Sequence, residues 1–247
     1  MLYAALTLWL LVIVFTAWGV HFLLTRLVKP RVVNVALLPG TLVAQLGHVL
    51  GMLITGNSVR NTALMRDDET GDPQSEPPDR QRLPVVGAVV VGLLPLLACA
   101  TSLYYAAHAW GGSIVSGAPE LPTDLPRSLA DFWSLLRFFV SSAEQTLTAI
   151  IQANLTQWQS LLFLYLSICL TVRMAPFEGI RRGALVAILL SGAIIALIGL
   201  IFAGWRGAIE SAWPILSFAV GMLILLLVIS LLISAVVGLI RIASRSE

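Results

Sequence analysis

Long apolar runs dominate the chain and divide it into candidate membrane spans. A helix that crosses the hydrocarbon core of a bilayer needs about 20 mostly apolar residues. Five runs reach this length, and a shorter run that ends before Pro176 is apolar enough to join them. These runs predict transmembrane helices at 2–25, 32–55, 83–109, 158–174, 183–204 and 214–240. The predicted fold class is therefore all-α, a polytopic integral membrane bundle of about six transmembrane helices.

The segment 129–157 has a different pattern, which predicts an amphipathic helix. Polar residues such as Arg137 and Glu144 lie off its apolar stripe. Two placements fit this pattern. The helix lies in the membrane interface with its aromatic residues at the headgroup boundary, or it forms a seventh span whose polar side faces other helices. The apolar stripe consists of Phe132, Leu135, Leu136, Phe139, Val140, Ala143, Leu147, Ile150 and Ile151.

Two polar stretches separate the apolar runs. The loop 57–82 is rich in charged residues and proline and has almost nothing to bury, so it is predicted to be polar and mobile. The loop 111–128 is rich in Gly, Pro and Ser and is predicted to be irregular. Neither stretch contains a soluble domain, so residues 1–247 are predicted to form a single membrane domain.

The composition agrees with this pattern, because 58% of the 247 residues are hydrophobic and only 11% are charged. We expect an integral membrane protein, in a bacterial cytoplasmic (inner) membrane, whose first partner is the lipid bilayer. No Lys/Arg-rich block suggests a nucleic acid partner. Cys99 and Cys169 each lie in an apolar run, where core packing explains them.

Basic residues predict the orientation. With six spans, Arg26, Lys29 and Arg31 lie on the side opposite to Arg241. If 129–157 also spans, every later residue changes sides. The short first loop is the most persuasive cytoplasmic signal, so the N-terminus is predicted to lie outside.

One apolar run, PGTLVAQLGHVLGMLITG at residues 39–56, carries the only motif that bears on chemistry. It resembles the motif helix of site-2-protease-like, membrane-embedded zinc metalloproteases, in which P-G-T precedes H-E-x-x-H. GLLPLLA at 92–98 resembles the Gly-x-x-Pro helix that follows the motif. APFEGIRRGAL at 175–185 resembles the later A-P-S-x-x-D segment, whose aspartate would be the third metal ligand.

The residues that would do the chemistry are absent at the matching positions. Ala44 stands for the first histidine, Gln45 for the general-base glutamate and Ile180 for the aspartate, so only His48 remains. Catalytic zinc needs three protein ligands and an open position for water, and an amide cannot take a proton from that water near neutral pH. Glu178, two residues before the aspartate position, would still leave the site one ligand short and without a base.

His48 is better explained as a neutral histidine that hydrogen-bonds across helices. Gln45 and His48 lie three residues apart on one face, which should turn into the protein. Gly47 and Gly51 form a small-residue seam that permits close helix contact, within this chain or in a dimer. Near Pro176, the residues from Arg173 onward form either a broken helix that enters the former active site or an ordinary charged loop.

The predicted function is therefore that of a non-catalytic member of this family, a pseudoprotease that binds another membrane protein, a transmembrane helix or a lipid. No catalytic, cofactor-binding or metal-binding residue is predicted, and no cofactor. One alternative is an active metal-dependent peptidase with rearranged ligands such as His48 and Glu178. The other is a small transporter or channel component, although the spans offer few polar residues for a path.

Overall fold

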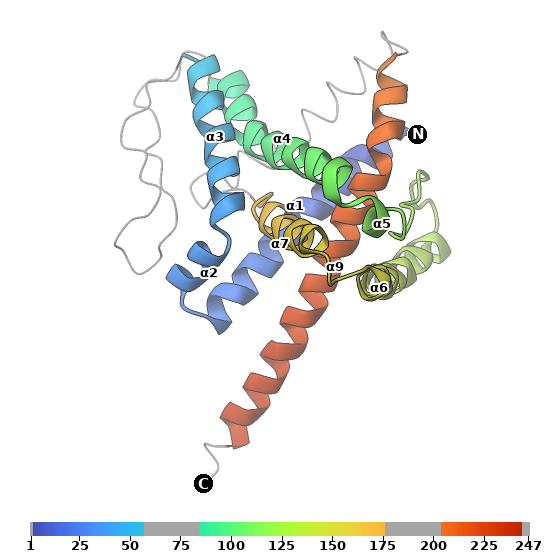
Figure 1. Ribbon diagram of the computed structural model, residues 1–247. Coiled ribbons are helices and arrows are strands. Elements are labelled where there is room, and N and C mark those ends of the chain that lie inside the picture. The colour runs from blue at the N-terminus through green and yellow to red at the C-terminus, as the bar shows by residue number, and fades with distance from the viewer. Residues whose placement is uncertain (1, 57–83, 176–203, 244–247) are drawn as a thin grey trace.

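The computed structural model describes residues 2–56, 84–175 and 204–243, and it contains no strand within these ranges (Figure 1). The predicted all-α class is confirmed for this part of the chain. The helices follow the predicted apolar runs, with one short addition after α4. In chain order they are α1 (Leu2–Leu27), α2 (Pro30–Ala36), α3 (Leu38–Ile54), α4 (Pro84–Trp110), α5 (Gly112–Val115), α6 (Leu129–Gln152), α7 (Trp158–Val172) and α9 (Gly204–Ala243).

Three of the described helices are long and apolar enough to cross a membrane. They are α1, the Val90–Trp110 part of α4 and the Ile209–Leu239 part of α9. The bent pair α2–α3 adds a fourth if it counts as one span, and α7 has only 15 residues. The predicted span 183–204, apart from its last residue, and the predicted loop 57–82 fall outside the described residues. The structure supports a helical membrane protein but not the count of six spans.

The predicted single helix 32–55 is wrong, because the chain bends by 82° between α2 and α3. Pro39 lies in the first turn of α3, where its missing N–H is not needed. In a continuous helix its ring would clash with a carbonyl one turn earlier. At the bend, the Tyr165 hydroxyl donates to the carbonyl of Ala36 at 2.9 Å and the Cys169 thiol donates to it at 3.5 Å. Side chains of α7 thus satisfy the backbone where the helix is interrupted.

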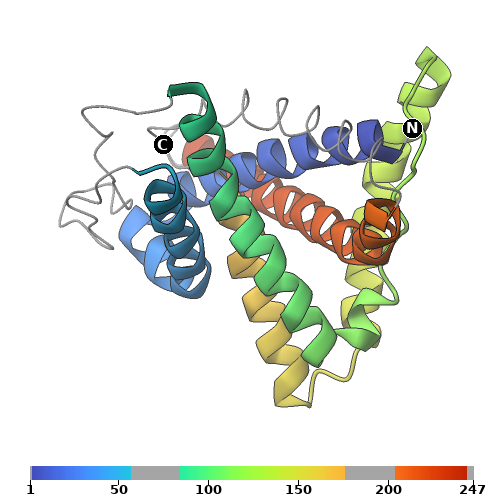
Figure 2. The same ribbon diagram turned by 90° about the horizontal axis from the view of Figure 1, so that it is seen from above.

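Helices α1 and α9 lie side by side and run in the same direction (Figures 1 and 2). Gly19 of α1 packs against Leu227 of α9. Ten residues earlier on each helix, Trp9 and Ser217 both hydrogen-bond to the loop that precedes α6. Both helices therefore end on the same side of the molecule. The six-span prediction placed the end of the last helix opposite to Arg26, and that assignment is wrong for α1 and α9.

Helix α6 runs across α1 and α9 at the edge of the bundle (Figure 2). Gly221 permits the close contact with α9, because a Cβ at this position would collide with the side chain of Thr146. On the α1 side, Phe138 and Phe139 pack edge-on against Trp9, with ring centroids 5.9 and 6.1 Å away. The helix ends at Gln152, five residues before the predicted end.

The aromatic centre of the core lies where α7 meets α9. The rings of Phe163 and Phe218 stack with centroids 5.4 Å apart, and both side chains are fully buried. Gly111, just after α4, makes room for the Phe163 ring, because a Cβ there would lie 2.5 Å from it. This contact ties the end of α4 to α7, so both helices that flank α3 are fixed to the core.

Candidate functional site

Helix α3 turns the motif residues into the bundle, as the sequence predicts. Ala44 is fully buried, and Gln45 and His48 are 8% and 4% exposed. Its other side carries exposed leucines, which suit lipid. The structure therefore places the polar residues of this helix against protein, where donors and acceptors are available.

Two glycines on this face bring α4 into direct contact with α3. A Cβ on Gly47 would lie 2.6 Å from the carbonyl oxygen of Leu94 and 2.8 Å from the Cα of Pro95. One turn later, a Cβ on Gly51 would lie 3.0 Å from the Cα of Val91. The two helices are therefore antiparallel, and the Gly-x-x-Pro segment packs on the motif helix. Of the two predicted roles for the glycine seam, the structure places it within this chain.

His48 belongs to the same contact between α3 and α4. It hydrogen-bonds to the backbone of Val91, the residue immediately before the Gly-x-x-Pro segment. This is the interhelical hydrogen bond that the sequence predicts for a neutral buried histidine. The imidazole thus has a packing role that requires no metal.

The end of α7 covers the first turn of α3. A Cβ on Gly40 would collide with the backbone carbonyl of Cys169 and would lie 3.1 Å from Cγ of Arg173. The Arg173 side chain is 5% exposed, and its guanidinium donates to the side-chain oxygen of Asn34 on α2. A buried guanidinium therefore links α2, α3 and α7. Sequence reasoning missed this role, because Arg173 was grouped with the charged residues of the following turn.

Both cysteines lie close to this guanidinium. Cys99 on α4 and Cys169 on α7 are free and buried, and each lies within the electrostatic reach of Arg173. The core-packing role predicted for the thiols agrees with their burial. A buried thiol in an apolar setting behaves mainly as a small hydrophobic group.

The residues at the motif positions do not fit a catalytic zinc ion. Ala44 offers no donor atom, and Gln45 offers only a weakly basic amide. Within the described ranges, no group of three or more His, Cys, Asp or Glu side chains is arranged to hold a metal ion. The residues from Pro176 to Ile180, including Glu178, lie outside the described part of the chain. Of the stretch 175–185, only Ala175, three residues after the end of α7, is described.

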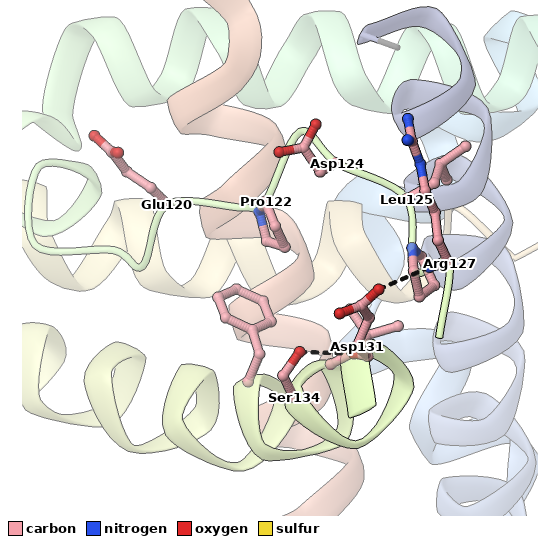
Figure 3. Close-up of a pocket in the computed structure, with 10 residues that line it drawn as sticks. Glu120, Pro122, Asp124, Leu125, Arg127, Asp131 and Ser134 are labelled. Atoms are coloured by element: carbon pink, nitrogen blue, oxygen red, sulfur yellow. Dashed lines mark hydrogen bonds between the residues drawn. The ribbon is translucent and has the colours of Figure 1, made fainter. Parts of the chain in front are cut away.

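A second candidate site lies beside the first turns of α6, where the loop that precedes this helix folds over it (Figure 3). It is a hollow of about 670 Å³ that opens to the surface. Apolar and polar side chains both line it, and the polar ones include three carboxylates and one guanidinium. The lining residues are Glu120, Pro122, Asp124, Leu125, Pro126, Arg127, Asp131, Ser134, Leu135 and Phe138.

Two tryptophans hold the loop against the spans. The indole of Trp9 donates to the carbonyl of Pro122, and the indole of Trp213 donates to the carbonyl of Leu121, both at 3.0 Å. The Leu121 N–H in turn donates to Ser217 Oγ at 3.2 Å. The predicted irregular loop is therefore anchored to α1 and α9, although it has no regular structure. Tryptophans with one polar contact are typical of the membrane–water boundary.

A capping box fixes the first turn of α6. The Asp131 N–H donates to Ser128 Oγ, and the Ser128 N–H donates back to the Asp131 carboxylate, each at 3.1 Å. A further bond from the Arg127 N–H, together with the Ser128 contacts, holds the pKa of the exposed Asp131 below its usual value. The pattern Ser-x-x-Asp before an apolar run is the sequence signal of this helix start, which lies at the predicted residue 129.

Comparisons of the chain with protein-family models, curated proteins and solved structures give no match. The resemblance to site-2-type proteases therefore stays a prediction from the three sequence stretches.

Proposed function

We propose that this chain is a non-catalytic, site-2-protease-like membrane protein that acts by binding a membrane partner, such as another membrane protein or a single transmembrane helix. The observation that carries the proposal is the environment of Ala44. This residue stands where the first zinc ligand would lie, and it is fully buried on α3, which packs against α4 and α7.

Burial at this position removes the space as well as the donor atom. A catalytic zinc ion needs an open coordination position for water. On the motif face, the backbone of α4 approaches Gly47 to within ordinary contact, and the backbone of α7 covers Gly40. A helix packed this closely on both sides is suited to a structural role, and the chain keeps a scaffold without its chemistry.

The active-enzyme alternative needs a ligand set around His48. The hydrogen bond from His48 to the backbone of Val91 favours a packing role instead. Glu178 stays a possible donor by sequence, since it lies outside the described residues. The zinc content and proteolysis of the His48→Ala variant therefore test this alternative directly.

The transporter alternative needs polar groups that are available to a moving ion or solute. Four buried hydroxyls in the described helices are instead used locally. Thr41, Thr146, Ser167 and Thr171 each donate to the carbonyl four residues earlier, at 2.6 to 3.0 Å. A hydroxyl that is bonded to its own helix gives little to a permeation path, so this alternative is weaker.

The proposal includes a topology. Because α1 and α9 are parallel, the number of membrane crossings from α1 to α9 should be odd rather than six. The amphipathic segment 129–157 is not counted as a crossing. We place the protein in a bacterial cytoplasmic membrane, with the basic ends of α1 and α9 inside, on the basis of the positive-inside rule.

Zinc content and proteolysis test the loss of catalysis. The full chain is purified in detergent without chelator, its zinc is measured by mass spectrometry, and its cleavage of a transmembrane peptide is followed in liposomes. We expect substoichiometric zinc and no cleavage, both unchanged by His48→Ala. His108→Ala, at an exposed histidine, serves as the matched control. One zinc per chain that His48→Ala removes, together with chelator-sensitive cleavage, would overturn the proposal.

Photo-crosslinking tests the binding role. A photoreactive amino acid is placed at Leu50 on the exposed side of α3, and in a control chain at Leu239 near the end of α9. After illumination in cells, we expect a discrete protein adduct from Leu50 and none from Leu239. Lipid adducts alone at Leu50 would count against a protein partner on the motif helix.

A further inference from the structure

We infer that α6 lies along the boundary between membrane and water, with one arc of its surface inserted into the lipid interface and another arc in water. The inference starts from the observation that α6 has three faces rather than two. Its contacts, exposure and charge divide the helix lengthwise into a buried arc, an exposed apolar arc and an exposed polar arc.

The buried arc binds α6 to the bundle. Ser142, Ala143, Thr146 and Ala149 are buried, and the arc packs on α9 at Gly221. Small side chains bring the two backbones together here. Near the start of the helix, the two phenylalanines that contact Trp9 extend the same arc onto α1.

The exposed apolar arc, which we call the lipid stripe, combines exposed members of the predicted apolar stripe with Leu129 and Trp133, which that prediction did not include. At 100° per residue its members fall within about 100° of the helix circumference. They are between 39% and 88% exposed. The lipid stripe consists of Leu129, Phe132, Trp133, Leu136, Val140, Leu147 and Ile151.

The exposed polar arc follows directly on the other side of the lipid stripe. It also covers about 100° and runs through the same length of helix. Its members are all exposed, and it contains one positive and one negative charge. They are Ser134, Arg137, Glu144, Gln145, Thr148 and Gln152.

The two exposed arcs fix how the helix lies. If α6 crossed the bilayer, Arg137 and Glu144 would face hydrocarbon from the outer surface of the bundle, which is costly for both. If water surrounded it, seven large apolar side chains would be wet. Because the line between the arcs runs parallel to the helix axis, both demands are met only when the axis lies in the plane of the interface.

The position of α6 along α1 and α9 agrees with this placement. Seventeen residues separate Trp9, where α6 contacts α1, from Arg26, which is about 26 Å along a helix. Twenty residues separate Gly221, where α6 contacts α9, from Arg241, which is about 30 Å. Both lengths match the hydrocarbon thickness of about 30 Å. The basic ends and α6 therefore mark the two opposite faces of the membrane.

Lipid, rather than a protein, is the occupant of the stripe, because α6 lies about one hydrocarbon thickness from the basic helix ends and the stripe carries an aromatic anchor. The guanidinium carbon of Arg137 lies 5.7 Å from the centroid of the Trp133 ring, at the junction of the apolar and polar arcs. Indole rings favour this level of the bilayer. Since the exposed charges of α6, which are Asp131, Arg137 and Glu144, give no net positive charge, insertion depends on apolar area and not on anionic lipid.

Spin-label accessibility tests the inference in the full chain. Single cysteines replace Phe132, Val140 and Ile151 on the lipid stripe, and Glu144 and Thr148 on the polar arc. Each variant is labelled and reconstituted into phosphatidylcholine vesicles. The unchanged chain, whose two thiols are buried, is the labelling blank. Collisions with oxygen report exposure to lipid, and collisions with a water-soluble nickel complex report exposure to water.

We expect the stripe labels to collide more with oxygen than with nickel, at one common depth of about 5–10 Å below the phosphates. The polar-arc labels should show the reverse. The values should not change when a third of the lipid is anionic. A depth that varies along the stripe by tens of ångströms, as in a spanning helix, overturns the inference. Stripe labels shielded from both reagents, as under a protein partner, or open to nickel also overturn it. None of these outcomes depends on whether the chain has lost its catalytic role.

Discussion

Helices α3 and α6 both carry polar residues on apolar helices, but they place them on opposite sides. Helix α3 buries Gln45 and His48 against neighbouring helices and exposes leucines. Helix α6 exposes Arg137 and Glu144 and buries small or aromatic residues. The outer surface of α3 is therefore suited to lipid or to an apolar membrane partner, whereas α6 also borders water. The location of the polar face, rather than the amount of apolar residue, distinguishes a helix within the membrane from one at its surface.

At Gly40 and Gly47, α3 packs directly against the backbone of neighbouring helices, so the largest effect is expected there. Gly40→Leu places a side chain against the backbone of Cys169, which cannot move aside as a flexible side chain can. We expect a loss of about 3 kcal/mol or more in the free energy of unfolding, at the upper end of overpacking costs. Thermal unfolding in detergent measures it. Gly238→Leu is the control, because nothing lies within 4 Å of that position, and equal losses in both variants would contradict the packing described for α3.

Breaking the guanidinium link between α2 and α7 should have the next largest effect. Asn34→Ala removes a buried acceptor of Arg173. A hydrogen bond to a charged group contributes about 1.5–3 kcal/mol, and we expect a loss of that size in the same unfolding experiment. Gln152→Ala, on the exposed polar arc of α6, should change stability by less than about 0.5 kcal/mol. Similar losses in both variants would mean that the buried hydrogen bond to Arg173 contributes no more to stability than an exposed polar side chain of α6.

Rebuilding the motif sharpens the comparison further. The double substitution Ala44→His and Gln45→Glu restores the H-E-x-x-H pattern on α3. Because Ala44 is fully buried, the larger side chain should overpack the contact and cost about 1–3 kcal/mol. We expect no stoichiometric zinc in the purified variant. Tight zinc binding would show that the buried face can open and that a third ligand lies within reach.

The start of α6 should tolerate change better than α3 does. Ser128→Ala removes the side-chain cap, and we expect a loss of about 1 kcal/mol. Ser134→Ala, one turn later and exposed, is the matched control. Its hydroxyl donates only to a carbonyl in the same helix turn, so we expect almost no change. Equal effects would mean that the capping box does not fix the first turn.

The smallest effect should appear in acid. The pKa of Asp131 is lower in the folded chain than its ordinary value of 3.8. Its contribution to stability is therefore fully present above about pH 4 and disappears as the pH falls through the lower, folded value. Asp131→Asn should flatten the dependence of the unfolding temperature on pH in this window. Near pH 7, the slope of the unfolding temperature with pH should not change. An unchanged slope below pH 4 would remove the capping interaction as its cause.

The sequence predicted helix existence better than helix geometry. Apolar runs located α1, α4, α7 and α9, because burial in lipid demands length and composition alone. The bend before α3 was missed, although Pro39 was visible, because the sequence is apolar on both sides of the bend. The parallel course of α1 and α9 could not be predicted, since it depends on how many segments between them cross the membrane.

The candidate site was predicted in part. The inward turn of Gln45 and His48 followed from the cost of unsatisfied polar groups in hydrocarbon. The buried role of Arg173 did not follow, because its partner on α2 lies 139 residues earlier in the chain. The hollow beside α6 was also missed, since its walls come from an irregular loop held by tryptophans on two distant helices. Long-range partners of this kind leave no local pattern.

The bend at Ala36 has a consequence for the order of membrane insertion. Its carbonyl receives hydrogen bonds from Tyr165 and Cys169, which are synthesised more than 120 residues later. A nascent chain that has delivered only its first helices to the bilayer has none of these donors. The early bent segment must therefore stay near the translocon or in the headgroup region until α7 arrives. The bent segment should thus reach its final position only after α7 has been synthesised. Chains truncated before α7 should therefore be degraded rather than accumulate.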